Sequence, residues 1–151
     1  TKQLGVAMTA AYKQLAHKSQ VDKIVIEETG ASRLLAKDNT EINFDRSAGE
    51  NQLFATALLA GLAEVSGIEA PLVVDTPLAR LDSEHRRNIL TFWISQKQRQ
   101  VILLAQDEEI DANMFESISG SVGKSYLLEH SGLGRGVGRA RAVENQYFKE
   151  R

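Results

Sequence analysis

The sequence predicts an α/β fold in which helices surround a mainly parallel sheet and short hairpins lie at its edge. Two continuous apolar runs, residues 72–74 and Val101–Leu104, have the length and composition of strands buried on both faces of a sheet. A helical pattern over residues 83–93 lies between them. The order of strand, helix and strand is typical of a parallel crossover, so we expect these two strands to be neighbours.

The N-terminal part of the chain predicts a helix, a hairpin and a second helix. Apolar side chains recur at helical spacing over residues 2–18. Residues 23–28 and 33–36 have the composition of two strands around a Thr-Gly turn. After a polar loop, the broad apolar face of residues 53–65 indicates a largely buried helix, which Gly67 is placed to end.

The elements that follow complete the α/β pattern. Ser83 is expected to cap the helix of the crossover, in which Phe92 and Trp93 are expected to pack in the core. Residues 108–118 predict another helix, and residues 125–148 predict short strands around a glycine-rich loop.

Composition limits the classes of function. The 151 residues are 42% hydrophobic and 25% charged, as in an ordinary globular domain. The net charge is -2, so any contact with DNA requires a local basic patch. The chain has no cysteine, no apolar run that could cross a bilayer and no signal peptide pattern, so we expect a soluble, cytoplasmic protein without a membrane partner. It begins at Thr1 inside a helical pattern, which indicates a segment of a longer polypeptide.

A first candidate site lies where the two apolar strands end. Asp75 directly follows one strand, and residues 106–108 follow the other. Ligands of open α/β sheets bind beyond the carboxyl ends of the strands. A carboxylate at this position can hold Mg²⁺, because a hard cation needs oxygen ligands at fixed positions. Asp75 is therefore the candidate metal ligand, although an aspartate here also commonly caps a neighbouring helix.

A second candidate site opens the long helix. Ser47, Ala48 and Gly49 stand at its start and are followed by Glu50 and Gln52. Small residues at a helix start leave backbone N–H groups and the positive end of the helix dipole facing outward, which favours phosphate. A plain N-cap serine followed by glycine is the alternative interpretation.

Three segments resemble the motifs of ABC-type ATPases, in the order of that superfamily. Residues 46–52 (Arg-Ser-Ala-Gly-Glu-Asn-Gln) are similar to the signature motif. Residues 71–82 (Pro-Leu-Val-Val-Asp-Thr-Pro-Leu-Ala-Arg-Leu-Asp) resemble a Walker B strand and D-loop, and residues 101–109 resemble the switch strand. The sequence of residues 75–86 and the Gln-Tyr-Phe at 146–148 most closely resemble the corresponding segments of DndD-like ATPases, which belong to bacterial DNA sulphur modification (phosphorothioation) systems.

This resemblance implies the C-terminal lobe of a P-loop, SMC-like ATPase head. Such a head hydrolyses ATP with Mg²⁺ when two heads pair, and its implied partners are an N-terminal Walker A lobe, a second head in a homodimer, DNA and other sulphur-modification proteins. A coiled coil joins the two lobes, so residues 1–20 are expected to be the end of its returning arm or a lead-in helix, and residues 21–151 the lobe itself.

The resemblance assigns the signature residues to the nucleotide of an opposite head. Ser47, with the backbone amides of Ala48, Gly49 and Glu50, would contact the γ-phosphate there, and Gln52 closes the motif. Two heads would thereby enclose two nucleotides.

The other motif residues would lie near the chain's own nucleotide or the partner head. Asp75 would hold Mg²⁺ through water, and Asp82 of the D-loop would touch the partner head. The usual general-base Glu is replaced by Thr76, whose hydroxyl accepts a proton poorly at neutral pH. The usual switch His is replaced by Gln106, which can orient water without taking its proton. We expect slow turnover, or a base at residues 107–108.

The sequence leaves two further functions open. One is an SMC-like DNA repair or recombination ATPase with the same motifs. The other is a clamp that binds ATP and pairs but barely hydrolyses it. In each case the Walker A motif must lie elsewhere, because Ile118 stands where the P-loop-like residues 120–125 would need a preceding glycine.

Overall fold

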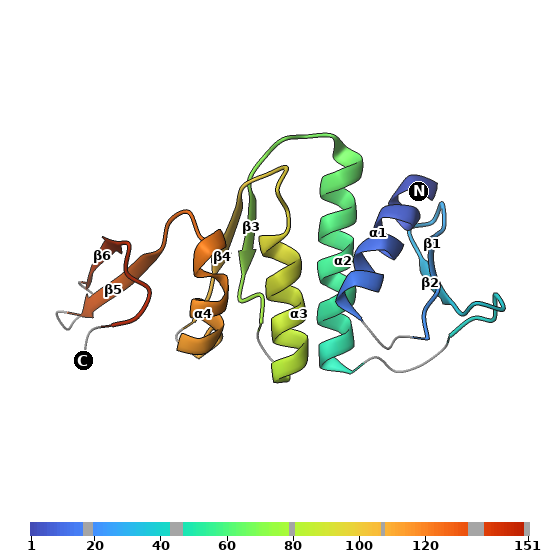
Figure 1. Ribbon diagram of the computed structural model, residues 1–151. Coiled ribbons are helices and arrows are strands. Elements are labelled where there is room, and N and C mark those ends of the chain that lie inside the picture. The colour runs from blue at the N-terminus through green and yellow to red at the C-terminus, as the bar shows by residue number, and fades with distance from the viewer. Residues whose placement is uncertain (17–19, 43–46, 79–80, 107, 133–137, 150–151) are drawn as a thin grey trace. The chain divides into compact units, whose positions relative to one another are not determined.

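The computed structural model describes residues 1–16, 20–42, 47–78, 81–106, 108–132 and 138–149. The chain divides into two compact units, Thr1–Glu109 and Ile110–Arg151 (Figure 1). The first unit holds the helices α1 to α3 and the strands β1 to β4, and the second holds α4, β5 and β6. None of the described helices is both long and apolar enough to cross a membrane.

Three helices form the core of the first unit. Helix α1 (Lys2–Leu15) packs against α2 (Ala48–Ser66) and β1 (Figure 1). It also contacts α3 (Ser83–Ile94). The α1 helix ends at Leu15, earlier than the expected residue 18, and residues 17–19 lie outside the described residues. The large side chains that these helices bury completely are Met8, Leu15, Leu53, Ile89, Leu90 and Trp93. The predicted burial of Phe92 and Trp93 is confirmed.

Helices α1 and α2 approach each other closely at a glycine. A Cβ atom on Gly61 of α2 would lie 2.8 Å from Cγ of Met8 and 3.1 Å from its backbone nitrogen. Real Cβ atoms do not come as close as 2.8 Å to other heavy atoms, so a larger residue at this position requires Met8 or the α1 backbone to shift. The absence of a side chain on Gly61 therefore sets the contact between the two helices.

The long helix α2 is less buried than its apolar sequence suggests. Leu62 and Val65 are exposed, which contradicts the expectation of a largely buried helix. The buried residues recur every three to four positions on one face. They are Leu53, Thr56, Ala57 and Gly61. Since α1 and α3 pack against α2, they cover this face and leave the rest of the apolar surface open.

The predicted hairpin and crossover are both present in the first unit. Strand β1 (Lys23–Ile26) pairs antiparallel with β2 (Ser32–Leu35). Strand β3 (Leu72–Asp75) pairs parallel with β4 (Val101–Leu104), and α3 lies between them in the sequence. The α/β prediction is thus confirmed, with two strands in each sheet that the described residues form.

One face of the parallel sheet is open. In the register of β3 and β4, Val73 pairs with Ile102 and Asp75 pairs with Leu104, so these four residues share a face. Val73 is 57% exposed, Ile102 38% and Leu104 44%. The expectation that these strands are buried on both faces is therefore wrong for the first unit, because its described residues provide no layer over this face.

The second unit consists of a short helix and a hairpin. Helix α4 (Ala112–Ile118) begins later than the expected residue 108, because the carboxylate of Asp111 caps it by accepting the Met114 amide at 2.8 Å. The 3₁₀ turn η1 (Ser119–Ser121) follows. Strands β5 (Tyr126–Gly132) and β6 (Gly138–Glu144) pair antiparallel, which agrees with the short strands predicted for this region. The rings of Phe115, Tyr147 and Phe148 pack together.

Candidate functional site

The N-terminus of α2 is capped by a serine and a glutamate that exchange hydrogen bonds. The Oγ atom of Ser47 accepts the amide of Glu50 at 3.2 Å, and the Glu50 carboxylate accepts the amide of Ser47 at 2.8 Å. This capping box fixes the start of the helix. The amides of Ala48 and Gly49 belong to the first turn, where a helix offers no acceptor of its own, so they can serve an anion.

The start of α2 lies against the segment that follows β3. The side-chain amide of Gln52 donates to the carbonyl oxygen of Pro77 at 3.3 Å. A Cβ atom on Gly49 would lie 3.5 Å from a methyl group of Leu81. The signature-like and Walker B-like segments are far apart in the sequence, and the fold brings them into contact.

Asp75 stands at the carboxyl end of β3 and is exposed. It shares the open apolar face of the sheet with Leu104. Among the residues that the structure describes, no three His, Asp or Glu side chains could together hold a metal ion. A lone carboxylate still fits Mg²⁺, which is commonly held by one or two carboxylates while water and substrate phosphates supply the other ligands.

Thr76 adopts a backbone conformation that is rare for its residue type. Its φ angle is 46°, in the left-handed region, which is unfavourable for a β-branched side chain. A residue before proline also normally avoids this region. The Thr76 amide donates to the carbonyl oxygen of Leu104 at 2.8 Å, so β4 helps to hold the strained residue in place.

Gln106 and Glu109 form a closed turn after β4. The Gln106 side chain is exposed, whereas its backbone amide donates to the Glu109 carboxylate at 2.8 Å. The Glu109 amide returns a bond to the Gln106 carbonyl oxygen at 3.0 Å. Of the two positions proposed for an alternative base, Glu108 is exposed and Asp107 lies outside the described residues.

Glu109 is the residue of this site that the sequence does not single out. It is 6% exposed, and its second carboxylate oxygen accepts the amide of Leu78 at 3.2 Å. Nearby, the guanidinium of Arg86 donates to the carbonyl oxygens of Leu81 at 2.9 Å and Glu108 at 3.1 Å. The segments after β3 and β4 are therefore joined by both side chains.

Asp82, not Ser83 as expected, is the N-cap of α3. Its carboxylate accepts the amides of Glu84 at 3.0 Å and His85 at 2.9 Å. The other oxygen lies 2.6 Å from Nδ1 of His85. The backbone amide of His85 and then its ring hold the pKa of the Asp82 carboxyl below its usual value. The carboxylate takes the cap because it accepts two amides at once, which the Ser83 hydroxyl does not do here.

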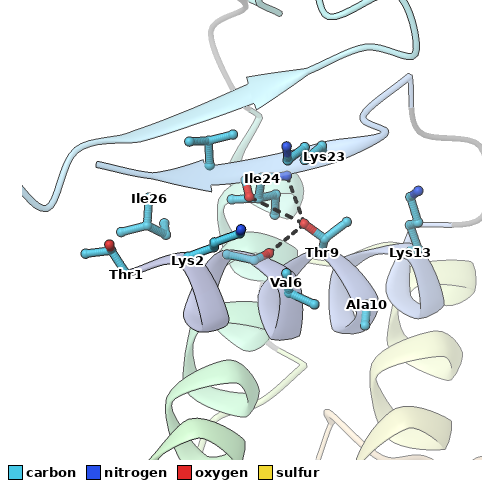
Figure 2. Close-up of a pocket in the computed structure, with 11 residues that line it drawn as sticks. Thr1, Lys2, Val6, Thr9, Ala10, Lys13, Lys23, Ile24 and Ile26 are labelled. Atoms are coloured by element: carbon cyan, nitrogen blue, oxygen red, sulfur yellow. Dashed lines mark hydrogen bonds between the residues drawn. The ribbon is translucent and has the colours of Figure 1, made fainter. Parts of the chain in front are cut away.

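A hollow of about 510 Å³ lies apart from these residues, along α1 and β1 (Figure 2). In it the hydroxyl of Thr9 accepts the Ile24 amide at 2.9 Å and donates to the Gly5 carbonyl oxygen at 2.6 Å (Figure 2). Lys2, Lys13 and other residues of α1 and β1 line it. No residue that the sequence assigns to the candidate site does so.

Comparison with solved structures identifies the fold. An SMC ATPase, for which ATP-driven dimerisation and DNA-stimulated activation are described, matches with a TM-score of 0.62 and 15% identity over 94% of this chain and 84% of that one. The Smc head domain of Pyrococcus furiosus, with an extended coiled coil and bound to the C-terminal domain of ScpA, matches with a TM-score of 0.60 and 15% identity. An Smc head bound to the winged-helix domain of ScpA gives 0.59 and 14%.

Both Smc head matches extend over 94% of this chain, but over only 35% and 43% of the longer chains that it matches. No protein-family model and no curated protein matches the sequence. The fold is therefore that of the C-terminal lobe of an SMC-type ATPase head, as the sequence predicts.

Proposed function

We propose that this chain is the C-terminal lobe of an ATPase head that binds and hydrolyses ATP when two heads pair, in a cycle coupled to DNA. The observation that carries the proposal is the contact between the start of α2 and the segment after β3, through Gln52 and Pro77. In this proposal the contact joins the helix start that binds phosphate to the strand end with the exposed carboxylate of Asp75.

Each motif segment has a role in this proposal. The Ser47 hydroxyl accepts the Glu50 amide through its oxygen, and its own proton can be donated to a phosphate oxygen of the opposite head's nucleotide. The amides of Ala48 and Gly49 add two further donors. Asp75 holds Mg²⁺, which neutralises phosphate charge when it is bound. The Gln106 amide group orients the attacking water.

The open face of the parallel sheet supports an N-terminal Walker A lobe as the partner. Val73, Ile102 and Leu104 expose apolar surface there, and Asp75 lies at the carboxyl end of the same face. A lobe that covers this face removes the apolar surface from water and brings its own nucleotide-binding residues next to Asp75. Residues 1–20 then supply the end of a coiled-coil arm or a lead-in helix to the lobe of residues 21–151.

Lobe association can be tested with two matched substitutions. Ile102→Asp places a charge on the open face and is expected to abolish binding to the Walker A lobe in a pull-down or by calorimetry. Ile68→Asp makes the same change at a residue that is 63% exposed in the segment after α2, and should bind normally. Equal binding by both variants would exclude this face as the lobe interface.

The hydrolysis step is tested by removing the carboxylate of Asp75. In the full-length protein, Asp75→Ala is expected to lower ATP turnover to background, because Mg²⁺ loses its protein ligand. Asp38→Ala, which removes an exposed aspartate from the segment after β2, is the control and should retain activity. A parent protein without ATPase activity would exclude the proposal.

The finer proposal is that the cycle serves DNA sulphur modification, together with other proteins of that system. The supporting observation is the amino-acid sequence of residues 75–86, which resembles that of DndD-like ATPases. Deletion of the gene is expected to abolish phosphorothioate in genomic DNA, measured by mass spectrometry of nucleosides. Unchanged phosphorothioate together with sensitivity to DNA damage would favour an SMC-like repair ATPase instead.

Thr76 supports the alternative of an ATP-dependent clamp with little hydrolysis. Its hydroxyl stands where a glutamate base is usual, so the water must lose its proton to another group. We expect Thr76→Glu to raise the turnover number of the full-length protein. Turnover that is already fast in the parent, and unchanged in Thr76→Glu, would exclude the clamp.

A further inference from the structure

Glu109 is a buried carboxylate whose partners are backbone amides. Its oxygens accept the amides of Leu78 and Gln106, which belong to the segments after β3 and β4. No ion pair of Glu109 is found in the part of the chain that the structure describes. Burying a carboxylate is unfavourable unless hydrogen bonds replace its hydration, so these two bonds account for its presence in this position.

The chemistry of the carboxylate suits this connection. A carboxylate has two oxygens that accept, and each faces one amide donor here. A glutamine of the same size has only one oxygen, and its NH₂ group would face the second amide as another donor. Glu109 therefore joins the two segments in a way that its neutral isostere does not.

The segment after β3 is held at three points by three different parts of the fold. The Thr76 amide is bound by the carbonyl oxygen of Leu104, the Pro77 carbonyl oxygen by Gln52 and the Leu78 amide by Glu109. These bonds surround the strained conformation of Thr76, and such strain persists only when its surroundings fix it. Of the three tethers, Glu109 is the one that also binds Gln106.

We propose that Glu109 is a positioning residue, which fastens the segment that carries Asp75 and Thr76 to the turn that carries Gln106, so that all three side chains face one phosphate in a fixed arrangement. The proposal rests on the proposed ATPase function. Arg86 supports the same arrangement from α3, since it binds the carbonyl oxygens of Leu81 and Glu108.

The test compares Glu109→Gln with the parent in the full-length protein. We expect kcat for ATP hydrolysis to fall about 10- to 100-fold, as for a reacting group displaced by about 1 Å, while the Kd for ATP stays within about threefold. Hydrogen exchange should become faster at the amides of Leu78 and Gln106, measured where both proteins are folded.

A purely structural role is separated by a control variant. Gly61→Ala disturbs the contact with Met8 and lowers the melting temperature without touching these segments. At a temperature where all variants are folded, it should keep the parent's kcat. If Gly61→Ala and Glu109→Gln lose kcat in equal measure, or Glu109→Gln keeps the parent's kcat, positioning by Glu109 is excluded.

A second variant decides the matter if Glu109→Gln does not fold. Arg86→Lys keeps the charge but loses the planar fork that reaches two carbonyl oxygens, and should lower kcat severalfold with little change in the Kd for ATP. An unchanged kcat would overturn the proposal. A parent without ATPase activity would overturn the proposed function as well, whereas an active parent with fully active variants would overturn the positioning role alone.

Discussion

At the start of α2 a serine hydroxyl caps the helix, whereas at the start of α3 a carboxylate does. Ser47 accepts one amide, that of Glu50, and keeps a proton to donate. Asp82 accepts two amides and the ring of His85, and it carries a negative charge. Both caps stabilise a helix, but they leave different surfaces for a ligand.

The difference indicates which helix start can receive a phosphate. At α3 the carboxylate of Asp82 accepts the amides of Glu84 and His85, so these two donors are already used. At α2 the charged group of the cap, the Glu50 carboxylate, binds the amide of Ser47 and leaves the amides of Ala48 and Gly49 for another acceptor. Under the proposed function we therefore expect the nucleotide's phosphate at the start of α2, where two amides have no acceptor of their own.

The largest expected effect comes from filling the start of α2. Ser47→Arg removes the hydroxyl and places a bulky side chain where the opposite head's phosphate would bind. We expect ATP-dependent pairing of heads to weaken about 10- to 100-fold, measured by analytical ultracentrifugation with and without ATP. Ser66→Arg, the same change at the other end of α2, is the control and should pair like the parent.

A smaller effect is expected from removing each cap. Ser47→Ala should lower stability by about 1 kcal/mol, which corresponds to about 2–4 °C in melting temperature for a chain of this size. Asp82→Ala loses the two amide bonds and the contact with His85, so its melting temperature should fall further. Ser47→Ala should also weaken ATP-dependent pairing of heads. Asp82→Ala should lower the melting temperature more than it weakens pairing. The reverse pattern would contradict the assignment of the two helix starts.

The smallest effect is a dependence of the α3 cap on pH. Hydrogen bonds from His85 lower the pKa of Asp82 in the folded protein, relative to about 3.9 in an unfolded chain. The charged cap therefore stabilises the fold fully above that value, and this contribution is lost as pH falls through the lowered folded pKa. Asp82→Asn keeps a capping oxygen without the charge. Its difference from the parent in free energy of unfolding should shrink on acidification, and a constant difference would exclude the effect.

Local patterns were sufficient to predict the main elements of the first unit. The spacing of apolar residues located α2 and α3, and the short apolar runs located β3 and β4 together with their parallel pairing. The prediction that these strands are buried on both faces was wrong. An apolar run indicates that a strand favours burial, but it does not show whether the same chain covers both of its faces.

The features of the site that the sequence did not predict depend on contacts between distant residues or on competition between neighbours, which local patterns do not encode. The buried carboxylate of Glu109 accepts a hydrogen bond from the amide of Leu78, which is 31 residues away in the sequence. Thr76 precedes a proline, so its local sequence favours an extended conformation rather than the left-handed one. The choice of Asp82 over Ser83 as the cap of α3 is a competition between neighbours that both have capping side chains.

The contact between Gly61 and Met8 has a mechanical consequence. A sliding movement of α1 along α2 would bring a side chain of α2 against the backbone of α1, since only Gly61 admits the close approach there. Close packing at Gly61 therefore opposes sliding of the two helices along each other.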